Sequence, residues 1–235
     1  MKKTALYLLI APLFFVACKS KCTTDLGIHA SRDFTVKPFV EVTVSGPIRL
    51  IMRQDSSFKI NVQADSNAIG LVKATVSGDQ LTVKLDGNYC GKDSVIVNAG
   101  IGDLKKLHAD GASKVYTASG IFVNTLDVDL KGAVKLNMDV SAMKLTTTTD
   151  GAAVINMLGQ AGTYELNSTG SVRLNAFAFV AGISKLNLNG VSDLKINVLN
   201  DLKIRTAGAA DIRYKGNPKN IEEKKSGTYK LEKVN

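Results

Sequence analysis

Glycines at a near-constant spacing constrain the fold of this chain more than any other feature of its sequence. Six of them recur 18 to 21 residues apart, at Gly111, Gly132, Gly151, Gly170, Gly190 and Gly208. The fourth residue after each glycine is aliphatic, namely Val115, Leu136, Ile155, Leu174, Leu194 and Ile212. An apolar position fixed in every unit indicates that the units stack and that these side chains form one continuous core.

Between the glycines, apolar and polar residues alternate with no sustained helical period, which is typical of β-strands. Glycine suits the corner of each unit, because the backbone there needs a positive φ or a close approach. We therefore expect an all-β fold, a right-handed parallel β-helix (solenoid) with irregular N-terminal coils. Asn137, Asn156 and Asn175 share one outward position and predict an amide ladder or a corner preference rather than a ligand site.

The first residues have the character of an export signal. Two lysines precede an apolar run over 5–16, which ends at Ala17 and Cys18. This run is too short to cross a bilayer, which needs about 20 apolar residues. The string Phe15-Val16-Ala17-Cys18 resembles a bacterial lipobox, which implies cleavage before Cys18 and a diacylglycerol on its sulfur.

The chain is therefore divided into a lipoprotein-type signal peptide (1–17), a tether (18–33) and a single β-helix domain (34–235). The domain ends in a basic segment from about residue 216. The lipid would make the membrane a partner. We expect a cell-envelope protein anchored to the outer membrane, on either its periplasmic or its cell-surface side.

Two cysteines remain after Cys18, and the basic charge of the chain is unevenly distributed. An exported location permits a disulfide between Cys22 and Cys90, which would pin the tether to the domain. Neither cysteine has the spacing of a metal or redox motif, so no metal or cofactor is expected. The formal charge is +9, which favours anionic partners in general. Much of the excess belongs to the tail, at Lys219, Lys224, Lys225, Lys230 and Lys233.

Several of these motifs together resemble a known family. The corners at 110–113 and 207–210 read Asp-Gly-Ala-Ser and Ala-Gly-Ala-Ala, a Val-Ser-Gly lead-in occupies 44–46, and Tyr-Lys-Gly-Asn-Pro at 214–218 precedes the lysine-rich end. Over roughly 34–230 the chain resembles the GIN-domain family, labelled autotransporter adhesin heads and frequent in Bacteroidetes lipoproteins. The resemblance implies a β-helix-like fold and adhesion, and it brings no catalytic or binding residues.

One constellation could support catalysis. The third position after the glycines holds Arg173, Asp193 and Asp211 in the last three units. The two carboxylates would lie about 5 Å apart on adjacent strands, near the separation in retaining glycosidases. The alternative, an ordinary cross-strand ion pair, is favoured because nothing in the sequence demands the burial that shifts a pKa. His29 and His108 have no metal-ligand spacing.

We therefore expect a non-enzymatic exported lipoprotein that presents a β-helix surface for adhesion or envelope binding. Its partners would be a glycan or a surface protein of the envelope or host, and no nucleic acid. The alternative is a polysaccharide-active enzyme, a lyase or glycoside hydrolase, that uses Arg173, Asp193 and Asp211. A purely structural envelope component is the third possibility, and the sequence does not specify an oligomeric state.

Overall fold

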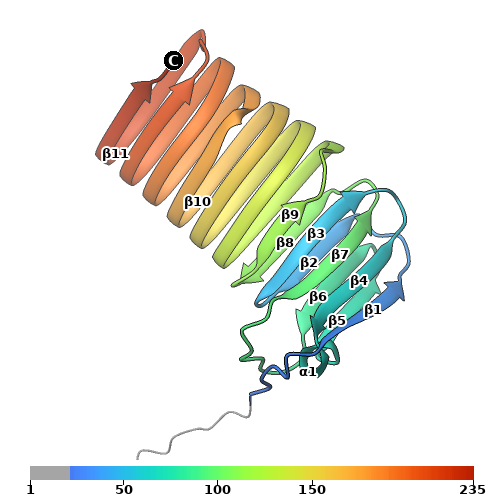
Figure 1. Ribbon diagram of the computed structural model, residues 1–235. Coiled ribbons are helices and arrows are strands. Elements are labelled where there is room, and N and C mark those ends of the chain that lie inside the picture. The colour runs from blue at the N-terminus through green and yellow to red at the C-terminus, as the bar shows by residue number, and fades with distance from the viewer. Residues whose placement is uncertain (1–21) are drawn as a thin grey trace, which may run out of the picture.

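The computed structural model describes residues 22–235, which are almost entirely β-structure (Figure 1). The helix in this part of the chain, α1 (Ser66–Ile69), is a single turn that follows the capping residue Asp65. The strands are β1 (His29–Thr35), β2 (Glu41–Ser45), β3 (Ile48–Gln54), β4 (Lys59–Asp65), β5 (Val72–Ser77), β6 (Gln80–Leu85), β7 (Val95–Ile101), β8 (Lys106–Gly111), β9 (Lys114–Thr117), β10 (Ile121–Lys215) and β11 (Asn220–Lys233).

Strand β10 is 95 residues long and winds through a series of stacked turns (Figure 1). Its first turn pairs in parallel with β8 and β9, and its last pairs in parallel with β11. Side chains alternate between the core and the outside, as the period of two requires. Leu136, Ile155 and Leu174 are at most 1% exposed, so this aliphatic position lies in the core in three successive turns.

The recurring glycines lie at the corners, where neighbouring turns approach most closely. Gly151 has a φ of +116°, and a Cβ placed on it would lie 2.6 Å from the carbonyl oxygen of Gly132. Gly132 in turn faces the backbone of Gly111, with a Cβ–oxygen distance of 3.0 Å. These corners therefore exclude side chains both by conformation and by contact with the preceding turn.

The N-terminal part of the sheet has mixed pairing. Strand β1 is antiparallel to β4, β4 is antiparallel to β7, and β5 and β6 form an antiparallel hairpin. Strands β2 and β3 pair only in parallel, with β6 and β8 and with β7 and β9. The result is a single 11-stranded sheet in the order β1-β4-β7-β3-β9-β10-β8-β2-β6-β5, with β11 attached to β10.

The all-β class was predicted correctly, but the right-handed parallel β-helix solenoid was wrong. The sheet is mostly parallel and partly antiparallel, and it curls almost closed around its core. Alternation with period two is common to both kinds of pairing, so it could not reveal the antiparallel strands. Residues 29–33, assigned to the tether, lie in β1 and pair with β4.

The signal peptide (1–17) and the lipidation site Cys18 lie outside the described residues. Between residues 22 and 235, no helix has the length and apolar character that a bilayer span requires.

Candidate functional site

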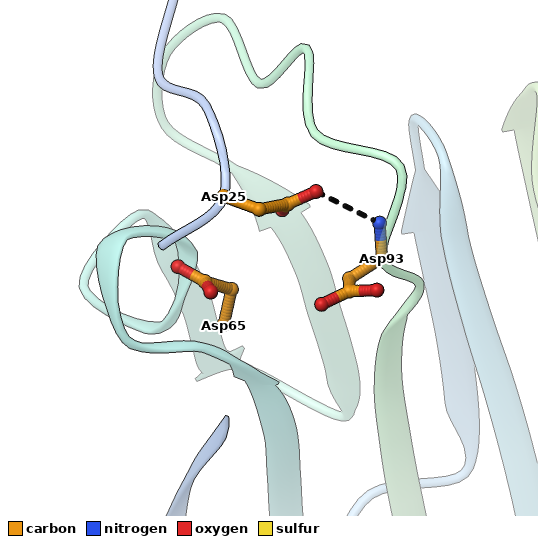
Figure 2. Close-up of side chains that lie close together, drawn as sticks. All are labelled: Asp25, Asp65 and Asp93. Atoms are coloured by element: carbon orange, nitrogen blue, oxygen red, sulfur yellow. Dashed lines mark hydrogen bonds between the residues drawn. The ribbon is translucent and has the colours of Figure 1, made fainter. Parts of the chain in front are cut away.

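Three carboxylates, Asp25, Asp65 and Asp93, come together where the N-terminal segment meets α1 (Figure 2). One oxygen from each lies within 4.8 Å of the others. Asp65 is buried, and its Oδ2 accepts the backbone N–H groups of Leu26, Gly27 and Ile28 at 3.0, 2.8 and 3.2 Å. The other oxygen of Asp65 is left to cap helix α1.

That oxygen, Oδ1, accepts the N–H of Asn67 at 2.9 Å. Burial by itself would raise the pKa of Asp65, but the backbone donors together hold the pKa below its ordinary value. A carboxylate held by four N–H groups is fully hydrogen-bonded in its ionised form.

Asp25 is held in the same way from the other side. It accepts the hydroxyl of Tyr89 and the backbone N–H of Lys92. It also accepts the backbone N–H of Asp93 at 3.2 Å (Figure 2). The Tyr89 hydroxyl, followed by these N–H groups, lowers the pKa of Asp25. Hydrogen bonds from the protein thus hold the carboxylates of Asp25 and Asp65 in place, and they fasten the N-terminal segment to the domain.

A disulfide fastens the same segment. Cys22 and Cys90 are bonded, with their Cα atoms 5.7 Å apart. Thr23 donates its N–H to the carbonyl of Asn88 and accepts the N–H of Cys90, both at 2.9 Å. We call residues 22–28, with the disulfide and the Asp25 and Asp65 hydrogen bonds, the N-terminal clamp. The sequence suggested the bond, but the roles of the two aspartates were not predicted from it.

The catalytic constellation of the enzyme alternative is an ion-pair network in the structure. Asp193 lies between two arginines, 3.5 Å from Nε of Arg173 and 3.1 Å from Nη2 of Arg213. Asp211 lies 3.9 Å from Nε of the same Arg213. The side chains of Asp193 and Asp211 are 39% and 49% exposed.

A carboxyl group acts as a general acid near neutral pH when burial raises its pKa. Asp193 and Asp211 are instead partly exposed to solvent and lie in ion pairs with arginine side chains. The arrangement supports the cross-strand ion pair over the catalytic pair. Sequence reasoning missed Arg213, although it lies two residues after Asp211 and therefore on the same face of the strand.

The histidines lie in similar surface networks. His108 Nδ1 is 2.9 Å from Asp129 Oδ2, and its Nε2 is 3.6 Å from Asp110. His29 lies 3.9 Å from Asp93 with a largely exposed side chain.

A groove of about 500 Å³ lies along the outer face of β9 and the first turns of β10. Three of its lining residues form a ladder of side-chain amides. Asn156 Nδ2 donates to Asn137 Oδ1 at 2.7 Å, and Asn175 Nδ2 donates to Asn156 Oδ1 at 2.9 Å. At the start of the ladder, Nδ2 of Asn137 is buried and donates to no acceptor in the described chain. We call this the amide groove.

Apolar and aromatic groups form the sides of the amide groove. Leu158, which is 52% exposed, and Phe177 line one side. Tyr116 and Lys195 also line the groove. The ammonium group of Lys215 lies 5.3 Å from the ring centroid of Phe177. The sequence predicted the amide ladder or a corner role, but it did not predict a groove, because the lining residues come from several turns.

Solved structures of other proteins share this architecture. A protein from Bacteroides fragilis described as a putative adhesin superposes with a TM-score of 0.79 at 20% identity, covering 90% of this chain and 99% of that chain. A putative lipid binding protein from Parabacteroides distasonis gives a TM-score of 0.71 at 18% identity, covering 92% and 100%. A putative adhesin from Parabacteroides merdae gives 0.65 at 21% identity, covering 90% and 98%. At these identities the likeness shows a shared fold.

Among curated proteins, no match was found. The family described as putative auto-transporter adhesin, head GIN domain, matches residues 38–218, which is well over half of the chain. This match spans the corner glycines and the amide groove. The chain therefore belongs to the GIN-domain family.

Proposed function

We propose that this protein is a non-enzymatic envelope lipoprotein that binds an extended glycan along the amide groove. The observation that carries the proposal is the groove itself, a hollow of about 500 Å³ that is lined by the amide ladder. Ligand sites in proteins are typically concave and largely apolar, with a few polar groups that fix orientation. The amide groove has this composition.

The chemistry of the lining matches that of a sugar chain. Each asparagine amide offers both donors and an acceptor, as a sugar hydroxyl does. Tyr116 and Phe177 supply ring surface for the apolar faces of sugars. Because the asparagines repeat at the strand spacing of about 4.8 Å, the groove suits a ligand that is itself repetitive.

The scarcity of acidic groups in the lining of the amide groove supports binding without turnover. Among the described residues that line it, Asp139 is the single carboxylate, whereas glycoside hydrolysis commonly requires two. The family to which the chain belongs is described as adhesin heads. Acylation at Cys18, proposed from the lipobox-like sequence, would place the domain on the cell envelope with the clamp nearest the membrane.

Replacing Asn156 by leucine tests the proposal, because this residue makes both hydrogen bonds of the ladder. Asn187→Leu is the matched control, because Asn187 donates to Asn167 at 2.7 Å in a second amide pair outside the amide groove. Binding to a panel of soluble polysaccharides is measured by calorimetry. We expect Asn156→Leu to weaken binding at least about tenfold, which corresponds to about 1.4 kcal/mol.

The control should retain the affinity of the wild type, and both variants should have similar thermal midpoints. Equal losses in the two variants, or shortening of any polysaccharide in the panel, would contradict the proposal.

A further inference from the structure

A row of positive charges runs beside the amide groove. Arg49 in β3 is paired with Lys114 in β9, and Lys114 is paired with Lys135 in β10, in parallel register. Directly opposed positions on neighbouring strands are about 5 Å apart, and like charges placed there destabilise the sheet. No ion pair in residues 22–235 includes any of these three side chains. The row therefore lacks the compensating carboxylates present elsewhere on the surface.

The row lies on the same face as the groove. Lys114 and Lys135 each precede a groove residue by two positions, Tyr116 and Asn137, and alternation along a strand directs both members of such a pair outward. The guanidinium carbon of Arg49 lies 5.8 Å from the ring centroid of Tyr116. The Nε of Arg49 is buried and has no hydrogen-bond acceptor in the described residues. The cations therefore form one margin of the amide groove.

The opposite margin differs in kind. Leu158 and Phe177 are apolar, and Asp139 is the single acidic residue of the lining within residues 22–235. Lys195 adds a further cation toward the C-terminal end of the groove. A ligand that lies over the amide ladder thus meets positive charge along one side and apolar surface along the other.

We propose that the ligand of the amide groove is an acidic polysaccharide, whose carboxylate or sulfate groups are bound by Arg49, Lys114 and Lys135. This inference rests on the proposed function and specifies its ligand. A chain of sugars with anionic substituents would relieve the repulsion within the row while its hydroxyls bind the amides. A nucleic acid duplex, by contrast, carries phosphates on two strands and offers no hydroxyl-rich face to the ladder.

The test compares polymers that differ only in charge. Dextran sulfate is paired with dextran of equal length, and polygalacturonate with its methyl ester. We expect each acidic polymer to bind at least about tenfold more tightly than its neutral counterpart at low salt. Binding should weaken with added salt, because screening and counterion release oppose the association of charges.

The double variant Lys114→Gln, Lys135→Gln removes two charges of the row. Its matched control is Lys73→Gln, Lys84→Gln, which removes two exposed lysines that oppose each other in the β5–β6 hairpin. The groove variant should bind acidic polymers about tenfold more weakly, and its slope of log Kd against log salt should fall by about two. The hairpin variant should bind as the wild type does. Neither variant should have a lower thermal midpoint, because each removes a repulsion.

The outcomes distinguish a failure of this inference from a failure of the proposed function. Equal affinity for charged and neutral polymers, with loss in Asn156→Leu, overturns the acidic ligand and leaves glycan binding in place. A failure of all four polymers to bind overturns both. The acidic ligand is also refuted if the groove and hairpin variants behave alike, or if duplex DNA binds as tightly as dextran sulfate and is unaffected by Asn156→Leu.

Discussion

Replacing both Cys22 and Cys90 by serine removes the covalent part of the N-terminal clamp. The disulfide joins residues separated by 68 positions. In the chain-entropy treatment, closing a loop of this length stabilises the folded state by about 4.4 kcal/mol, because it restricts the unfolded chain. This value is an upper estimate, because strain in the folded state and residual structure in the unfolded state both reduce it.

The effect reaches this size only if residues 22–28 remain in place without the bond. Three backbone N–H groups bound to Asp65, and the two backbone hydrogen bonds of Thr23, should keep them there. We therefore expect a loss of about 3–4 kcal/mol. For a domain of this size, that corresponds to a fall in the thermal midpoint of about 6–16 °C.

Denaturant unfolding at pH 7, analysed by linear extrapolation, measures this loss. The wild type under a reducing agent should match the double-serine variant, and the reducing agent should leave that variant unchanged. A loss below about 1 kcal/mol would refute the reasoning, because it would mean that the closed loop does not restrict the unfolded chain.

Three further predictions concern the core, the corners and the clamp. Leu174→Ala, at a fully buried position, should cost about 2–5 kcal/mol of unfolding free energy, measured with denaturant. Gly151→Ala should cost about 1–3 kcal/mol, whereas Gly70→Ala, at φ −69° with no neighbouring atom within 4 Å, should be neutral or slightly stabilising in the same assay. Asp25 and Asp65 have pKa values lowered from 3.8 in the folded state, so the stability that they contribute is fully present above that pH. This stability is lost as the pH falls through the folded pKa values. Acid titration of Asp65→Asn should therefore show a smaller loss of unfolding free energy below pH 3.8 than the wild type shows. An equal loss would mean that Asp65 does not contribute to this pH dependence.

Features that repeat along the chain could be predicted from the sequence, whereas local strand pairing could not. Leu136, Ile155 and Leu174 could be placed in the core because one apolar position recurs in every unit. The asparagines could be placed on the outside in the same way. Hairpins such as β5–β6 use the same alternation as parallel strands, so the mixed pairing could not be predicted from it.

The sites depend on contacts between residues that are distant in sequence. Arg49 and Lys114 are 65 positions apart, and their register follows from the pairing of β3 with β9. The role of Asp65 depends on Leu26, Gly27 and Ile28, which come 37 to 39 positions earlier. An aspartate immediately before a short helix is a common capping signal, and it could have drawn attention to this residue.

The disulfide of the N-terminal clamp also determines how the protein responds to mechanical load. A pull applied to the chain ahead of Cys22 passes through the sulfur bridge directly to Cys90. Residues 23–89 form a closed covalent loop, so tension cannot extend them while the bridge is intact. When the chain is pulled between a point ahead of Cys22 and strand β10, the backbone within this loop is bypassed, and the pull enters the sheet at the segment leading to β7.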